Sequence, residues 1–213
     1  MPQGLFITFE GIDGCGKSTQ IAMLEEYLGS AGVEFRRVRE PGGTSVGEKI
    51  RNVLLDKKND NMDPVCELLL FEAARAQITS EVIKPSMEQG ITVISDRFFD
   101  STYAYQGYAR KLGTDVVSDL NLTATGGLKP DITFLLDLDP VTALARRGIR
   151  GEAEDRMEAL GMEFQSAVRA GYLDMASRDD RIRVIDASRP RDEIASEIIS
   201  VTKESLIARG YKV

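Results

Sequence analysis

The chain has 213 residues, with 34 acidic and 27 basic side chains, a formal net charge of −7, two cysteines and no histidine. The lack of histidine excludes catalytic triads and metal sites that depend on imidazole, and two cysteines are too few for a disulfide framework or a zinc cage. The negative charge disfavours bulk electrostatic attraction to nucleic acid or to an acidic membrane, so neither is expected as a partner.

The first residues, MPQGLFITFEGIDG, lack the basic region and the long apolar region of a secretion signal. No run of the sequence approaches the roughly 18 consecutive apolar residues of a transmembrane helix. The default expectation is therefore a cytoplasmic protein whose two thiols stay reduced.

Short segments rich in Ile, Val, Leu and Phe alternate along the chain with longer helical stretches. Strands are predicted at 5–10, 33–39, 91–95, 132–137 and 182–185. Helices are predicted at 17–30, 46–55, 64–89, 114–123, 140–147, 152–176 and 191–208. Ser45 and Glu48 fit a capping box, and Asp63 before Pro64 fits an N-cap followed by proline. The alternation predicts one α/β domain, with a five-stranded parallel sheet flanked by helices on both faces.

A glycine-rich motif follows the first predicted strand. The segment GIDGCGKS has the pattern G-x-x-x-x-G-K-[ST] between a strand and a helix, where backbone N–H groups and the helix N-terminus surround phosphate oxygens. Lys17 is expected to reach the β- and γ-phosphates of a nucleotide, Ser18 to ligate Mg²⁺, and Cys15 to contribute only its backbone. The predicted phosphate-binding residues are Gly11, Ile12, Asp13, Gly14, Cys15, Gly16, Lys17, Ser18 and Thr19. The alternative is a glycine-rich turn before a helix; the motif indicates a three-layer P-loop NTPase fold.

Two other strands end in charged residues at the same predicted edge of the sheet. Asp96, at the end of the third strand, is placed to orient the Mg²⁺ shell, and Arg97 faces the same crevice. The second strand ends in Arg39 and Glu40. A surface salt bridge and a solvated loop are the respective alternatives. Cys66, in an apolar helical run, is expected to pack in the core.

Several segments occur in the order found in thymidylate kinases: GIDGCGKST, VREPGGTS, FEAARAQ, DRFFDSTYAYQG and a later arginine-rich stretch. The chain resembles the bacterial type of this P-loop nucleoside monophosphate kinase family over almost all of its length, as a single kinase domain at 1–213. The resemblance implies that ATP phosphorylates dTMP to dTDP with Mg²⁺. It also implies a homodimer, with nucleotides as partners and no role for nucleic acid or membrane.

The resemblance also assigns an acceptor site. Phe71 would stack on thymine, Arg75 would donate to a base carbonyl, and Thr102 and Gln106, four residues apart, would bond the base edge. Tyr103 would lie beneath the deoxyribose. The implied dTMP-binding set is Asp13, Arg39, Glu40, Arg51, Phe71, Arg75, Arg97, Ser101, Thr102, Tyr103 and Gln106. For Phe71, core packing is the alternative, and for Arg51 a solvated helix position.

The segment at about 146–156 concentrates four arginines and resembles the mobile lid of bacterial members. The lid arginines that could supply charge to the transferred phosphoryl group are Arg146, Arg147 and Arg150. Together with the lid, the implied catalytic residues are Asp13, Lys17, Arg97 and Arg150. The alternative is a solvated charged turn. The loop at 185–190 would pack against adenine.

Other functions are compatible with a P-loop. The chain has no N-K-x-D segment, which argues against a GTPase. Another nucleoside monophosphate kinase or a deoxynucleoside kinase is the alternative enzyme, although deoxynucleoside kinases usually carry Glu-Arg-Ser where this chain has Asp96-Arg97-Phe98. A nucleotide-dependent switch without acceptor turnover is the alternative outside enzymes.

Overall fold

A computed structural model describes residues 4–150 and 155–213. Its centre is a parallel sheet in the order β2-β3-β1-β4-β5. The strands are β1 (Phe6–Glu10), β2 (Phe35–Arg39), β3 (Thr92–Asp96), β4 (Ile132–Asp137) and β5 (Ile182–Asp186). The predicted α/β class and five-stranded parallel sheet are confirmed.

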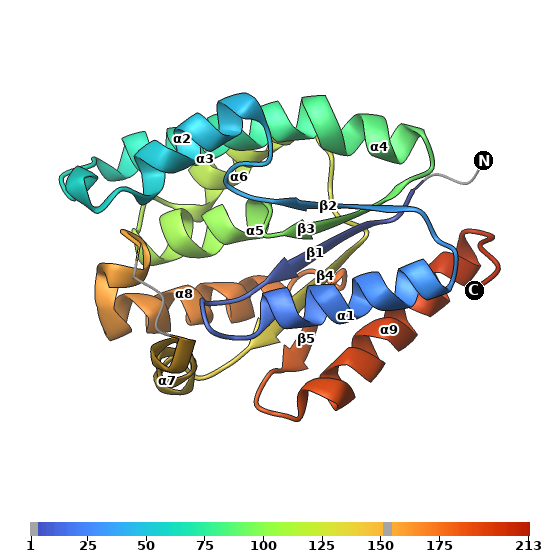
Figure 1. Cartoon of the computed structure of the whole chain (residues 1–213). Helices are drawn as coiled ribbons and strands as arrows, with labels where there is room; N and C mark the ends of the chain where they lie inside the picture. Colours follow the sequence, from blue (N-terminus) through green and yellow to red (C-terminus); the bar gives the residue numbers. More distant parts are fainter. Residues whose placement is uncertain (1–3, 151–154) are drawn as a thin grey trace.

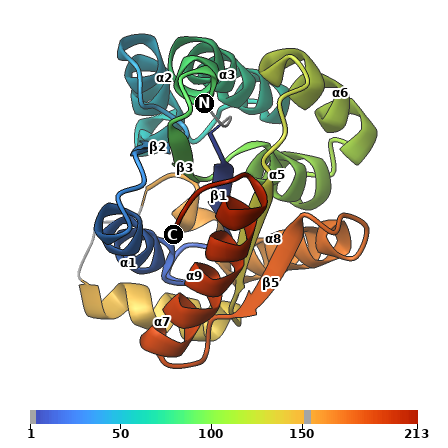
Figure 2. The same cartoon turned by 90° about the vertical axis from the view of Figure 1, so that its right-hand side faces the viewer.

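Helices cover both faces of this sheet, which gives three layers (Figures 1 and 2). The α-helices are α1 (Lys17–Ser30), α2 (Ser45–Leu55), α3 (Pro64–Ile78), α4 (Lys84–Glu88), α5 (Phe99–Thr102), α6 (Thr114–Thr125), α7 (Pro140–Arg150), α8 (Gly161–Ala176) and α9 (Arg191–Ala208). Helices α1 and α9 pack together on one face, and α3, α5 and α8 lie on the other. Among the described residues, every helix is too short or too polar to span a bilayer.

The central strands are buried on both faces, as is usual in parallel sheets. All five residues of β1 are buried, and the rings of Phe9 on β1 and Phe134 on β4 lie 5.4 Å apart, centre to centre. The edge strand β2 instead exposes Arg36 and Arg37 to solvent. The apolar core therefore fixes the carboxyl end of β1, from which the glycine-rich loop emerges.

The helix caps follow the sequence in one case and differ by one residue in the other. Asp63 caps α3, since its carboxylate accepts from the N–H groups of Val65 and Cys66. The cap of α2 is Thr44 rather than Ser45, and its hydroxyl accepts from Gly47 N–H at 2.9 Å. Thr44 is the cap instead of Ser45 because Thr44 has the extended backbone that an N-cap residue needs.

Two predicted helices are wrong in extent. The single helix expected at 64–89 is divided by a π-helical segment, Thr79–Ile83, just before Pro85. Proline lacks an N–H group and its ring clashes with the preceding turn, so a widened turn accommodates it. The helix expected at 152–176 begins only at Gly161, which follows the 3₁₀ turn Glu158–Leu160; residues 152–154 lie outside the described part of the chain.

The sequence reading missed a helical stretch at the end of β3. Helix α5 continues into a second π-helical segment, η3 (Tyr103–Ala109), which packs against α8. π-helical turns frequently occur at functional sites, because they shift side chains relative to an ordinary helix. This segment carries the residues of the motif DRFFDSTYAYQG.

Candidate functional site

The glycine-rich loop has the backbone that its sequence predicts. Gly11, Gly14 and Gly16 all have positive φ angles, of 128°, 91° and 105°. A Cβ atom on Gly14 would lie 2.3 Å from the carbonyl oxygen of Ala143, so no larger residue fits there. The loop ends at the N-terminus of α1, where Lys17 Nζ donates to the carbonyl oxygens of Gly11 (3.1 Å) and Ile12 (3.3 Å). The turn is therefore shaped to direct backbone N–H groups and one ammonium towards a phosphate chain.

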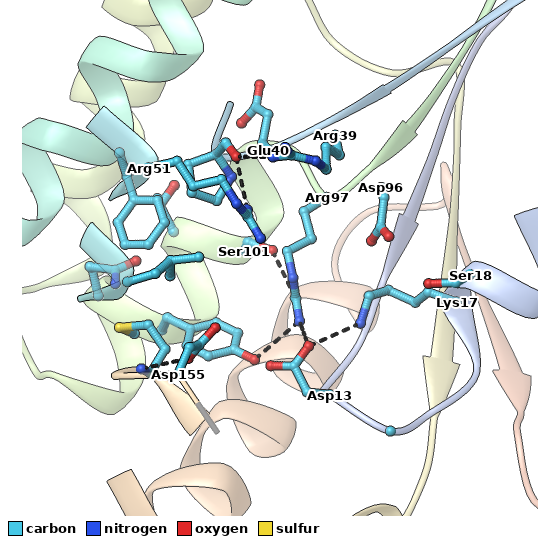
Figure 3. A pocket seen from close by; sticks show the side chains of 18 of the residues that line it. Asp13, Lys17, Ser18, Arg39, Glu40, Arg51, Asp96, Arg97, Ser101 and Asp155 are labelled. Atoms are coloured by element: carbon cyan, nitrogen blue, oxygen red, sulfur yellow. Dashed lines mark hydrogen bonds and ion pairs between the residues drawn. The ribbon is translucent and has the colours of Figure 1, made fainter. Parts of the chain in front are cut away.

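Next to this loop lies a cavity of about 310 Å³ at the carboxyl ends of β1, β2 and β3 (Figure 3). Of the predicted phosphate-, metal- and lid-site residues, those lining it are Asp13, Gly14, Gly16, Lys17, Ser18, Asp96 and the lid residue Arg147. Of the predicted acceptor-site residues, those lining it are Asp13, Arg39, Glu40, Arg51, Phe71, Arg97, Ser101, Thr102 and Gln106. Residues lining it that the sequence reading did not select are Pro41, Leu55, Tyr105, Asp155 and Met157. The tertiary structure thus brings most of the predicted site together.

Arg97 is the most highly connected side chain of the cavity. Its Nη2 donates to Asp13 at 2.6 Å, and its Nη1 donates to Gly11 O, Ser101 Oγ and Tyr172 Oη. Its φ angle is +74°, a strained value for a residue with a side chain, and such strain concentrates at functional sites. These contacts hold the guanidinium in one orientation between the glycine-rich loop and the cavity.

Asp13 receives two cations, one from each side. Arg97 contacts it at 2.6 Å and Lys17 Nζ lies 3.6 Å from the same oxygen, as the dashed lines of Figure 3 show. Although burial raises the pKa of Asp13, the charges of Arg97 and Lys17 hold it well below its usual range. Asp13 is therefore ionised at neutral pH, and it connects the lysine of the loop to the arginine of the cavity.

Glu10, which the sequence reading did not select, supports Arg97 from beneath. This fully buried carboxylate accepts from Phe98 N–H (2.7 Å), Ser101 Oγ (2.6 Å) and Tyr172 Oη (2.7 Å). Burial, together with the charge of Asp100, raises its pKa to about 6. Its signal in the sequence was a glutamate that ends a mainly apolar strand, since a buried carboxylate needs dedicated partners.

Arg75 lies behind the cavity wall instead of lining it. The side chain is 1% exposed, and Nε donates to Glu40 at 2.9 Å. Its remaining acceptors are Glu72, Thr102, Asn121 and the carbonyl oxygen of Phe98. Arg75 therefore braces Glu40 and Thr102, which do line the cavity, and its contact with a base carbonyl stays a prediction.

Glu40 is buried beside the cavity with one oxygen bonded and one free. Oε2 accepts from Arg75, whereas Oε1 has no hydrogen-bond partner among the described residues. Burial raises the pKa of this carboxyl and the charge of Arg75 lowers it. Burial has the larger effect, so the pKa rises to about 7. The group therefore changes its protonation state near neutral pH.

Glu40→Gln is expected to flatten the dependence of stability on pH between about 4.5 and 7. A carboxyl whose folded-state pKa exceeds its unfolded value binds its proton more tightly in the folded chain, so its stabilising contribution is complete below about pH 4.5 and is lost as the pH rises towards 7. The shift corresponds to about 3 kcal/mol. Urea unfolding at about pH 5 and about pH 7.5 measures the free energy of unfolding of the wild type and of Glu40→Gln. An equal change of this free energy with pH in the two proteins would contradict the raised pKa.

Arg39 and Arg51 converge on the carbonyl oxygen of Pro41, each donating to it at 2.9 Å. Arg39 also forms a two-bond ion pair with Glu48, at 3.0 and 2.9 Å. The carbonyl oxygen is a shared acceptor, and Glu48 offsets part of the positive charge, so the two guanidinium groups can lie close together. The pair supplies positive charge to the cavity on the side opposite the glycine-rich loop, as Figure 3 shows.

The family model described as thymidylate kinase matches residues 9–198. The chain belongs to the thymidylate kinase family. It is 48% identical over 205 residues to thymidylate kinase of Thermoanaerobacter sp. (strain X514), covering 96% of this chain and 100% of that one, and 47% identical to that of Symbiobacterium thermophilum, covering 96% and 95%. The crystal structure of thymidylate kinase from Ehrlichia chaffeensis superposes with a TM-score of 0.76 at 37% identity, covering 95% and 99%.

Within this thymidylate kinase fold, Tyr103, the predicted sugar contact, does not line the main cavity. Tyr103 lines a different cavity, between α5, α6 and α8, and its hydroxyl donates to Asp174. Tyr105 lines the main cavity instead, with its ring 5.4 Å from the guanidinium carbon of Arg97. Residues four apart share a helix face, so the spacing that paired Thr102 with Gln106 also pairs Ser101 with Tyr105. The spacing in the sequence is therefore compatible with Tyr105 beside Ser101, and the orientation of the π-helical segment decides that Tyr105 faces the cavity.

The predicted lid arginines have separate surroundings. Arg147 lines the main cavity and a smaller one beside α7, and its charge acts on Asp13. Arg146 Nη1 donates to the carbonyl oxygen of Ala187, in the loop predicted to pack against adenine. Arg150 is the last residue of α7, and its side chain, like residues 151–154, lies outside the described part. The catalytic role of Arg150 therefore remains a prediction.

The two cysteines behave differently from each other. Cys66 is exposed on α3, so the expected core packing is wrong. Although the residue stands in an apolar run, its side chain is not among those that α3 buries. Cys15 is buried in the glycine-rich loop, and burial raises the pKa of its thiol despite the charge of Lys17. A neutral buried thiol is a poor nucleophile, which agrees with a backbone role for Cys15.

The oxygen donors of the cavity fit a magnesium ion. Ser18 and Asp96 both line it, and Figure 3 shows them on the same side as Lys17. Among the described residues there is no group of three or more carboxylate, thiol or imidazole ligands. Mg²⁺ in nucleotide sites uses one or two protein oxygens and takes its other ligands from phosphates and water. The donor set therefore suits Mg²⁺ accompanying a nucleotide.

Proposed function

We infer that this chain transfers the γ-phosphoryl group of ATP to dTMP, forming dTDP and ADP in nucleotide biosynthesis. The observation that carries the inference is the meeting of two cations at one carboxylate. Lys17 of the ATP-phosphate loop and Arg97 of the acceptor pocket both contact Asp13, so the two phosphate sites adjoin inside a single cavity. Membership of the thymidylate kinase family supports the choice of substrates.

The proposed mechanism needs no histidine. The attacking group is an oxygen of the acceptor phosphate, which is already anionic, so catalysis consists mainly of positioning and of neutralising charge. Arg39, Arg51 and Arg97 orient the acceptor phosphate, and Lys17 stabilises charge on the β- and γ-phosphates. Mg²⁺, held by Ser18 and Asp96, would neutralise further phosphate charge when bound. Phe71, Thr102 and Gln106 hold the base.

The experiment that tests this function measures ADP release with dTMP, dUMP, thymidine and AMP as acceptors. Turnover is expected with dTMP, and dUMP is expected to be poorer by about 10- to 200-fold, because one methyl group separates the two bases. Thymidine offers no phosphate to the arginine cluster and should not react. Preferred turnover of AMP or thymidine would overturn the proposal in favour of another nucleotide kinase.

Arg150→Ala is expected to lower kcat by about 10³-fold while leaving KM for dTMP nearly unchanged. In related phosphoryl transfer an arginine that acts on the transition state contributes on this scale. Steady-state kinetics with dTMP measures both constants. Arg183→Ala, on the exposed side of β5, is the matched control. An unchanged kcat would remove Arg150 from the proposed lid at about 146–156.

We further propose that one kinase domain, 1–213, forms a homodimer in the cytoplasm. Helices α2 and α6 both pack against α3, and all three carry large exposed apolar side chains, which mark interaction surfaces. These are Val53, Val65, Leu69, Val116 and Leu122.

Leu69→Asp is expected to halve the mass measured by sedimentation equilibrium. Leu69 on α3 is 50% exposed in the single chain, so a charge there costs little in a monomer but much in a buried interface. Asp substitution of Val184, an exposed residue of β5, is the control. Dimers of undiminished stability in the Leu69 variant would place the interface elsewhere.

A further inference from the structure

Glu67 is a fully buried carboxylate of α3 that does not line the main cavity. Its Oε1 accepts from Gln106 Nε2 at 2.8 Å, and its Oε2 accepts from Arg156 Nη1 at 2.6 Å. Arg110 donates to both oxygens, at 3.3 and 3.1 Å. A buried carboxylate is stable only when its partners stay in place. Glu67 therefore joins three side chains that lie at least 39 residues away from it in sequence.

On one side, Glu67 fixes the orientation of Gln106. Gln106 comes from the π-helical segment η3 and lines the main cavity. A carboxylate can only accept hydrogen bonds, so the amide nitrogen of Gln106 must face Glu67. The amide oxygen is then directed away from Glu67, and it presents an acceptor to a donor group of a bound base.

On the other side, Glu67 holds Arg156. Arg156 is 6% exposed; its Nε donates to the carbonyl oxygen of Leu54 at 2.7 Å, and its backbone N–H donates to that of Leu55 at 3.3 Å. Its two neighbours in the chain, Asp155 and Met157, both line the main cavity. The ion pair with Glu67 attaches the segment 155–157 to α3, and the two hydrogen bonds attach it to the end of α2. Asp155 and Met157 are thereby kept against the cavity.

We propose that Glu67 is a positioning residue that couples Gln106 to the segment 155–157. The coupling rests on the proposed function. It means that dTMP bound against Gln106 stabilises the attachment of Arg156, and that loss of this attachment weakens the binding of dTMP. Reciprocity is required, because coupling between two sites is one free energy seen from either end. The segment 155–157 then closes one wall of the acceptor pocket in response to the base.

Amide hydrogen exchange with dTMP alone tests the coupling. In the wild-type protein, dTMP is expected to slow exchange of the Arg156 amide, whose hydrogen bond to Leu55 closes this attachment. In Glu67→Gln, the slowing is expected to disappear and the dTMP dissociation constant to rise by about 5- to 100-fold. Isothermal titration calorimetry without ATP measures the second quantity.

Two further variants keep the test decisive. Glu67→Gln leaves Arg156 buried without its counter-charge, so the double variant Glu67→Gln/Arg156→Met removes that burden if the single variant is unstable. The double variant is expected to bind dTMP weakly, with no slowing of exchange at residue 156. Arg110→Met is the matched control, because it removes one partner of Glu67 and leaves Gln106 and Arg156 attached. It should retain the slowing caused by dTMP.

The outcomes separate the coupling from the function it rests on. Undiminished dTMP affinity and undiminished slowing in both Glu67 variants would overturn the coupling, with the kinase activity intact. Equal losses in Arg110→Met and Glu67→Gln would also overturn it, since general loosening of α3 would explain both. A wild-type protein that neither binds nor phosphorylates dTMP would overturn the proposed function itself.

Discussion

Replacing Lys17 with methionine is expected to lower kcat for dTMP phosphorylation by about 10³-fold. The Lys17 side chain is only 7% exposed and lies against the loop, with Nζ 3.1 Å from Gly11 O. The ammonium is held at the N-terminus of α1 by the carbonyl oxygens of Gly11 and Ile12 and by the carboxylate of Asp13. Methionine preserves length and removes the charge that acts on the transferred phosphoryl group.

The measurement is single-turnover phosphorylation, with calorimetric ATP affinity measured separately. Lys17 interacts with phosphate charge that grows during transfer, so kcat should fall far more than ATP binding weakens. Lys203→Met, an exposed position on α9, controls for the loss of one positive charge. A kcat within about tenfold of the wild-type value would exclude the catalytic role of Lys17.

Arg97→Lys is expected to lower kcat/KM for dTMP by about 10²- to 10³-fold, although the charge is conserved. Arg97 bonds Asp13 through Nη2 and Gly11, Ser101 and Tyr172 through Nη1. A lysine ammonium is a point charge that cannot span these positions, so the orientation of the acceptor phosphate is lost. Both residues carry a Cβ atom, so the strained φ of +74° contributes equally to the two proteins.

Initial rates at varied dTMP concentration measure this effect, and circular dichroism confirms that the variant is folded. Arg37→Lys, on the exposed strand β2, is the control, since its ion pair with Glu25 lies on the surface and contributes little. Should Arg97→Lys keep kcat/KM within about threefold, the fork geometry of Arg97 would not matter and its charge alone would suffice.

Local sequence signals predicted much of this fold. The five strands were recognised because short apolar runs alternate with helices, and the α3 start because Asp63 precedes Pro64. The errors lie where tertiary packing overrides local preference. The apolar periodicity predicted one helix at 64–89, which is divided just before Pro85. Helix α8 begins nine residues after the predicted start at 152. The helical stretch at Phe99–Ala109 is stabilised by packing on α8, which no local pattern reports.

The site shows the same division at the level of single residues. The glycine-rich loop could be predicted because its chemistry depends on neighbouring backbone groups. The positive φ angle of Gly14, where a Cβ atom would clash with the carbonyl oxygen of Ala143, agrees with that prediction. Glu10 had a local signal, a glutamate ending a mainly apolar strand, but its partners Ser101 and Tyr172 lie 91 and 162 residues away and could not be predicted. The choice between Tyr103 and Tyr105 depended on how a π-helical segment is turned towards the cavity.

The sequence by itself determined the α/β class, the phosphate loop and the family resemblance, because each depends on residues close together in the chain or on motif order. Its net charge of −7 excluded bulk attraction to polyanions but did not indicate where the cations gather. Only the tertiary structure decided that Lys17 and Arg97 share Asp13 and that Glu67 connects Gln106 to Arg156. Such contacts arise when elements far apart in sequence meet at one edge of a sheet, and burial then requires each charge to find its partner.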